Sequence, residues 1–200
     1  AGSGTDQFIR SLLVARKIVP DEVLRLQPVG SPSAVMAAFD KHLIDGFVLS
    51  APYPDLAQAN GTGVIAIDAF RGEIPEIKDV PYTAMLTSRR TMKARPAAIM
   101  GTTRALTRAI TYAQDHPDDT QRLLHQYFKS VDPALFAKFE PVYRRAAARS
   151  PIITQLQYDR LKSWLKLTEA APADTPYAQA VDTTFATEAA KDLLPTRAPT

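Results

Sequence analysis

The sequence contains no cysteine. That absence excludes disulfide bonds, thiolate metal ligands and cysteine nucleophiles. No apolar run reaches about 18 residues, the length that a membrane-spanning helix needs, so the sequence predicts no such helix. The three histidines, His42, His116 and His125, match no metal-binding spacing, and neither a serine elbow nor a phosphate-binding lysine loop occurs. We therefore expect no catalytic residue, no metal and no cofactor.

The sequence also lacks a large excess of either charge. There are 24 basic and 21 acidic residues, a net charge of +3, which is too small to indicate a nucleic-acid partner. The basic clusters at 89–95 and 144–149 are typical of solvated helix faces. Hydrophobic residues make up 46% of the chain, enough for one sizeable domain or two small ones.

The first part of the chain alternates between helical and strand-like patterns. Apolar residues recur at helical spacing over 6–17, from Ala34 after a Ser33 cap, and over 54–59. Short apolar or alternating runs predict strands at four segments, which are 23–29, 47–49, 64–67 and 82–87. This order predicts an α/β fold with a largely parallel sheet.

The rest of the chain is predicted to be mainly helical. Helices are expected over 96–114, after Pro117, after Pro133, over 154–166 and around Phe185, with a loop over 170–176. Pro141 should kink or split the helix that begins after Pro133. Because the composition changes near residue 82, we divide the chain into 1–82 and 83–200.

Three helix-opening loops should lie at one edge of the predicted sheet, where parallel α/β folds bind ligands. Their hydroxyl and free N–H groups suit an anionic head group. The candidate ligand-binding residues are Ser3, Gly4, Thr5, Ser31, Ser33, Ser50, Pro52 and Tyr53. An alternative interpretation makes each loop an ordinary helix cap. Asp6 would repel an anion, or could meet a ligand ammonium group.

Several motifs, taken in order, carry a resemblance. A GSGT loop opens a helix, KIVPDEV follows at 17–23, and KHLIDG and SAPYP follow at 41–46 and 50–54. A predicted strand then crosses into TSRRTMKARP at 87–96, before a long helix and the motif PDD at 117–119. In this order they resemble the substrate-binding proteins of nitrate/sulfonate/taurine-type ABC transporters. The sequence departs from that pattern at Lys17, where the family has glycine.

The resemblance implies a periplasmic-binding-protein type II fold, in which two α/β lobes close on a ligand. Residues 1–82 would form the second lobe, 82–87 the return crossing, and the later helices would complete a first lobe whose sheet, with the strand feeding GSGT, precedes this sequence. The implied function is capture of a small anionic or zwitterionic solute (sulfonate, nitrate or taurine) for a membrane permease. The implied location is periplasmic or extracellular, and the implied state is a monomer.

Three other functions stay open. Enzymes of thiamine-pyrimidine synthesis resemble these binding proteins, but they use histidine and cysteine-rich segments, whereas this chain has no cysteine and its edge loops hold no histidine. A sensory ligand-binding domain would share the same pattern. A helical interaction protein would leave the serine-rich loops as caps only.

Overall fold

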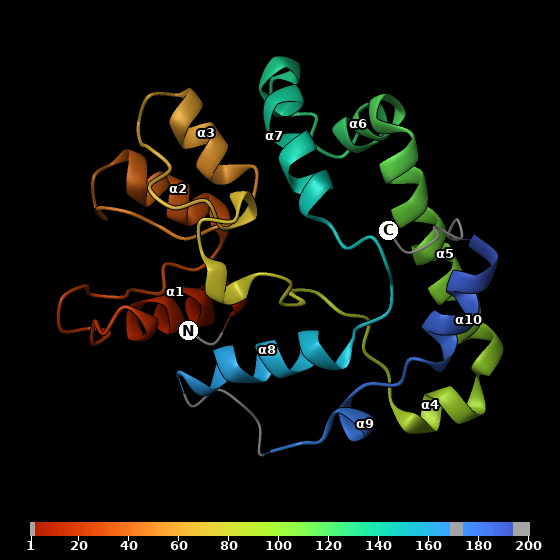
Figure 1. Cartoon of the computed structure of the whole chain (residues 1–200). Coiled ribbons are helices and arrows are strands. Elements are labelled where there is room, and N and C mark those ends of the chain that lie inside the picture. The colour runs from red at the N-terminus through yellow and green to blue at the C-terminus, as the bar shows by residue number, and fades with distance from the viewer. Residues whose placement is uncertain (1–2, 169–173, 194–200) are drawn as a thin grey trace.

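The computed structural model describes residues 3–168 and 174–193, so the predicted loop over 170–176 lies partly outside the described residues (Figure 1). The regular elements in these ranges are all helices. They are α1 (Gly4–Ala15), α2 (Pro32–Asp40), α3 (Tyr53–Ala59), the short 3-10 helices η1 (Ala69–Arg71) and η2 (Pro75–Ile77), α4 (Arg89–Ala94), α5 (Pro96–Asp115), α6 (Pro117–His125), α7 (Pro133–Ala146), α8 (Gln155–Lys166), α9 (Tyr177–Ala180) and α10 (Thr184–Leu193).

The helices begin where local sequence signals place them. Asp132 accepts hydrogen bonds from two N–H groups in the first turn of α7, and Thr154 forms a reciprocal capping box with Gln157 at the start of α8. Proline occupies the first position of α5, α6 and α7, where its missing N–H costs nothing. The predicted helices of the second half are therefore confirmed.

Three details of the helices differ from the prediction. The α2 helix begins at Pro32 and is capped by Ser31, not by Ser33, because proline fits the first helical position. The α7 helix continues through Pro141 rather than splitting there. The α4 helix was not expected; Ser88 caps it by accepting from the N–H of Thr91.

The predicted strands are not observed. No strand occurs within residues 3–168 and 174–193, and segments 23–29, 47–49, 64–67 and 82–87 are extended or irregular, so the α/β layer expected for 1–82 is absent from the described chain. An alternating pattern shows that a segment can pair, but a strand forms only against a ladder partner. The side chains of Val64 and Leu86 are 85% and 90% exposed, so no neighbour covers them.

Two apolar clusters hold the helices together. Leu12 of α1, Ile74 and Trp164 of α8 form the first, which joins α1 to α8. Phe136 and Phe139 of α7 form the second with Val131 and the partly buried Ala51 and Phe128. The helices α5 and α10 also lie side by side (Figure 1). None of the described helices is both long and apolar enough to cross a membrane.

Candidate functional site

The start of α1 presents two linked hydroxyl groups. Ser3 caps the helix, since its Oγ accepts a hydrogen bond from the N–H of Asp6 at 3.3 Å. The Oγ of Ser3 also lies 3.1 Å from Oγ1 of Thr5. Either hydroxyl can be the donor in this pair. When Ser3 donates, the Thr5 hydroxyl is left as a donor toward a third group. Hydroxyl chains of this kind polarise one another.

The charge of Asp6 is balanced within the protein. Its Oδ1 accepts from Nε of Arg10 at 3.0 Å, one turn along α1, and Arg10 also donates to Asp21 at 3.0 Å. Hydrogen bonds to Asp21 and then to Asp6 raise the pKa of Arg10, and the bond from Arg10 lowers the pKa of Asp21. The objection that Asp6 would repel an anionic ligand is therefore weakened, because the guanidinium offsets its charge.

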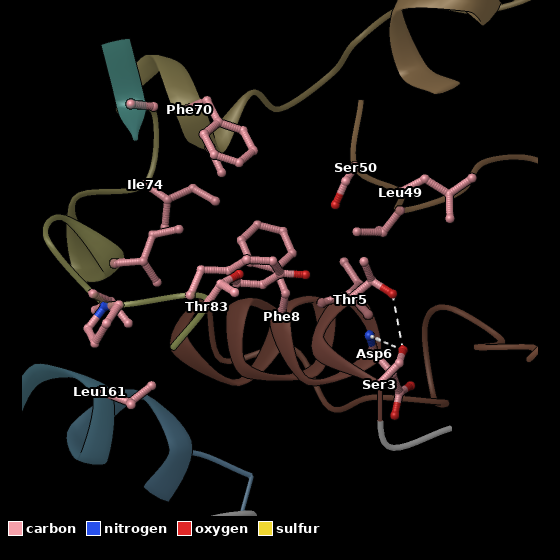
Figure 2. Close-up of a pocket in the computed structure, with 18 of the residues that line it drawn as sticks. Ser3, Thr5, Asp6, Phe8, Leu49, Ser50, Phe70, Ile74, Thr83 and Leu161 are labelled. Atoms are coloured by element: carbon pink, nitrogen blue, oxygen red, sulfur yellow. Dashed lines mark hydrogen bonds between the residues drawn. The ribbon is translucent and has the colours of Figure 1, made fainter. Parts of the chain in front are cut away.

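Ser50 reaches the same space from a different segment. It follows the extended run 47–49 and lines the hollow that Ser3 and Thr5 also line (Figure 2). Just beyond it, the Ala51–Pro52 peptide bond is cis and α3 begins at Tyr53. The structure thus brings together two of the three predicted loops through the side chains of Ser3, Thr5 and Ser50.

The remaining predicted residues lie elsewhere. Ser31 and Ser33 hydrogen-bond to each other at 3.0 Å at the start of α2, and neither lines the hollow. Pro52 is buried at the start of α3, and neither it nor Tyr53 lines the hollow. The loop before α2 contributes Gly30 to the lining instead.

Tyr82 is a residue that sequence reasoning placed in a crossing strand and not in the site. A Cβ built on Gly4 would lie 2.9 Å from the Tyr82 hydroxyl oxygen and 3.3 Å from Cζ, so the phenol rests against the first turn of α1. Tyr82 and its neighbour Thr83 both line the hollow beside Ser3 and Thr5. In the sequence, Gly4 is the one sign of this contact, because a glycine allows another group to approach the backbone closely.

The hollow changes in character from one end to the other. Ser3, Thr5 and Ser50 supply hydroxyl groups at one end in Figure 2. Apolar and aromatic side chains border this end and continue away from it: Leu49 lies beside Ser50, and Phe8, Phe70, Ile74 and Leu161 lie farther along the hollow. A polar end next to an apolar wall is the usual arrangement of a small-molecule site, in which few polar groups fix the orientation.

The volume of the whole hollow is about 3470 Å³. Small-molecule pockets occupy about 300–1,000 Å³, so a small solute would fill only part of it. Exposed side chains of the unpaired extended segments, such as Val64 and Leu86, line much of the remainder. The hydroxyl-bearing end is therefore the part with the chemistry of a ligand site.

The hollow holds neither a histidine nor a cluster of metal ligands among the described residues. No group of three or more potential metal ligands occurs within the described residues. None of the three histidines lines the hollow: His116 precedes α6, and Nε2 of His125 lies 3.0 Å from the carbonyl oxygen of Val131. The lining combines hydroxyl groups and apolar side chains with charged residues such as Asp68, Lys78 and Lys162.

A half-buried carboxylate, Asp55, follows Ser50 by five residues. Asp55 is in the first turn of α3, beside Tyr143 of α7, and its Oδ2 is buried without a hydrogen-bond partner. Burial raises the pKa of Asp55, and the negative charge of Asp68 acts in the same direction. Burial likewise raises the pKa of Tyr143 far above its ordinary value.

Comparisons with known proteins were made at three levels. Residues 1–127, from α1 through α6, match the NMT1-like family. No curated protein matches the chain, and no solved structure matches it. The family is composed mostly of solute-binding proteins and has a periplasmic-binding-protein-like fold. Since the match covers more than half of the sequence, the chain belongs to the NMT1-like family.

Proposed function

We propose that the protein is the extracytoplasmic solute-binding component of an ABC importer, which captures a small organic solute with an anionic or zwitterionic head and presents it to a membrane permease. The observation that carries the proposal is the meeting of Ser3, Thr5 and Ser50 at the polar end of an apolar hollow. Family membership supports the solute-binding role. Sulfonate, nitrate and taurine are the candidate head-group chemistries.

In this proposal the Thr5 hydroxyl donates to an oxygen of the ligand head. The N–H groups at the start of α1 support it, because the first intrahelical bond runs from the N–H of Gln7 to the carbonyl of Ser3 at 3.0 Å and the preceding amides lack helical acceptors. Ser50 supplies a second hydroxyl from the opposite wall. Asp6 stays paired with Arg10 and so leaves the head group to the hydroxyls.

The proposal also includes the division of the chain near residue 82. Residues 1–82 carry the polar end of the site, and the later helices belong to the facing lobe. Closure of the two lobes on the solute would select the closed state through the contacts that the ligand makes only there. The proposed working state is a monomer in the periplasm or at the extracellular face.

An enzyme of the thiamine-pyrimidine type is less well supported. The resemblance gives such enzymes histidine and cysteine-rich segments, and no histidine or cysteine lines the hollow. The binding proposal needs only the hydroxyls and the apolar walls that are present.

A thermal-shift screen tests the proposal. The protein from its full reading frame is heated with alkanesulfonates, arylsulfonates, taurine and nitrate, and a solute that binds the native state raises Tm by mass action. We expect the ligand-induced rise to disappear in Thr5→Val, which keeps the shape of the side chain but loses the donor.

Ser33→Ala is the matched control, because Ser33 is also a hydroxyl near a helix start but does not line the hollow. It should keep the full ligand-induced rise. A folded protein that shows no rise with any of these solutes, or a Thr5→Val variant that responds as Ser33→Ala does, would contradict the proposal.

A further inference from the structure

Tyr82 has the surroundings of a ligand-contacting residue. It is 63% exposed, although it is a large aromatic side chain, and it lines the hollow. Its phenol rests on Gly4, one residue from each of the two linked hydroxyls of Ser3 and Thr5. A ring in this place borders the polar end of the site directly.

The ring of Tyr82 continues into a longer aromatic wall. Gly4 and Phe8 are four residues apart in α1, so they lie on the same face of that helix one turn apart. Tyr82 covers the Gly4 position of this face, and Phe8 lines the hollow from the next turn. Phe8 is held in place by Trp164, with ring centroids 6.3 Å apart. Among the described residues no comparable ring contact covers Tyr82, which is 63% exposed, so its outward ring face is open to a ligand.

We infer that Tyr82 is a specificity-determining contact and that the solute is an arylsulfonate or arylcarboxylate, whose ring lies along Tyr82 and Phe8 while its oxygens meet Ser3 and Thr5. The inference rests on the proposed function and narrows it. It predicts that the protein binds a solute with an aromatic ring more tightly than taurine, which has a short aliphatic chain, or nitrate, which has no carbon group. Aromatic pairs prefer offset or edge-to-face contact, which a ring entering beside a single exposed phenol can adopt.

Gly4 leaves the space in which the Tyr82 phenol lies. A side chain at position 4 would need the space that the Tyr82 hydroxyl occupies, 2.9 Å from the added Cβ. Gly4→Ala would therefore push the phenol away from α1 and out of line with Phe8. Since the Tyr82 ring is the flexible end of an exposed side chain, the protein stays folded and the change acts on the ligand.

The test compares two probes with the same head and different bodies, benzenesulfonate and methanesulfonate, by titration calorimetry on the protein from its full reading frame. We expect the wild type to bind benzenesulfonate more tightly. Aromatic contacts of this kind change affinity by about two- to tenfold. Tyr82→Leu should weaken benzenesulfonate binding more than methanesulfonate binding and so lose that preference, and Tyr82→Phe should keep the preference because the ring remains.

Tyr127→Leu is the matched control, since Tyr127 is 85% exposed and does not line the hollow. It should behave as the wild type does. If both probes bind equally, or if Tyr82→Leu leaves the preference intact, the inference about Tyr82 is overturned while solute binding stands. If neither probe nor any other solute binds the folded protein, the proposed function itself fails.

Discussion

The rings of Phe70 and Tyr143 lie with their centroids 4.6 Å apart at an interplanar angle of 58°. Phe70 belongs to η1 and Tyr143 to α7, so this pair fastens the irregular first part of the chain to a helix of the second part. Asp55 of α3 lies next to the same tyrosine. An ionisable carboxylate therefore lies close to an apolar, aromatic contact between distant segments.

Neutralising Asp55 should stabilise the protein. Burial raises the pKa of Asp55 above its ordinary value of 3.8, so the native state holds the proton more tightly than the unfolded chain does. This contribution to stability is complete below pH 3.8 and is lost as the pH rises through the raised native pKa. Asp55→Asn should raise the free energy of unfolding at pH 7 by about 1 kcal/mol and should flatten its pH dependence above pH 4.

Urea unfolding between pH 3.5 and 8 measures this effect. Glu22→Gln, which changes an exposed carboxylate between helices, should leave the pH profile as it is in the wild type. A profile for Asp55→Asn that runs parallel to the wild type would show that the carboxylate does not titrate differently in the native state.

Arg144 should contribute to the stability of the fold mainly while Glu140 is present. Glu140 is 4% exposed, its Oε1 accepts from Nε of Arg144 at 2.9 Å, and its Oε2 is buried without a partner. Arg144→Met would leave a buried charge uncompensated and should cost about 3–5 kcal/mol. Replacing both residues with Leu and Met should recover most of the loss, because no charge then remains in the interior.

A double-mutant cycle followed by urea unfolding tests this coupling. Equal losses for Arg144→Met with and without Glu140 would mean that the arginine acts through packing and not through the ion pair.

Leu12→Ala should weaken the contact between α1 and α8. Leu12 is 5% exposed and shares a cluster with Ile74 and Trp164. Leucine-to-alanine changes in such positions cost about 2–5 kcal/mol through lost burial and the cavity left behind. Trp164 is the only tryptophan in the sequence, so its fluorescence reports the unfolding of this cluster directly.

Leu156→Ala is the comparison for Leu12→Ala, since Leu156 lies on α8 but is 60% exposed. It should change the free energy of unfolding by about 0.5 kcal/mol or less. Similar losses for the two variants would argue against a buried contact at Leu12.

Thr154→Ala should remove the capping box of α8. The Thr154 Oγ1 accepts from the N–H of Gln157 at 3.3 Å, and the Gln157 amide oxygen accepts from the N–H of Thr154 at 2.9 Å. Loss of the threonine cap should cost about 1 kcal/mol, whereas Thr154→Ser should cost little because serine caps equally well. Thermal melts followed by circular dichroism separate the two, and an equal fall in Tm would exclude the cap as the cause.

The sequence predicts helices well here because their signals are local. Asp132 and Thr154 begin helices through bonds to residues two or three positions away, so a short window contains the whole cause. The expected strands at 47–49 and 64–67 depend on partners elsewhere in the chain, which an apolar run does not specify. The prediction of these strands was wrong for the described residues, because strand pairing is a long-range property that a local pattern does not specify.

The candidate site divides in the same way. Ser3 and Thr5 could be placed at a helix start from the GSGT motif alone, and the structure brings Ser50 to the same hollow. Tyr82 could not be placed there, because its contact with Gly4 joins residues far apart in the sequence. Ser33 was equally plausible by composition and lies away from the hollow, since a hydroxyl near a helix start does not reveal which way it faces.

The contact of α1 with α8 has a consequence for the order of folding. The α6 and α7 helices adjoin in sequence and contact each other, so they close only a short loop, whereas Leu12 and Trp164 meet across most of the chain. Loop-closure entropy grows with length by about 0.6 kcal/mol per doubling, and distant contacts therefore form late. The α1 helix, which Ser3 caps and which carries Thr5, should dock after the α5–α7 helices have formed, so a nascent chain completes this side of the hollow only once α8 has been synthesised.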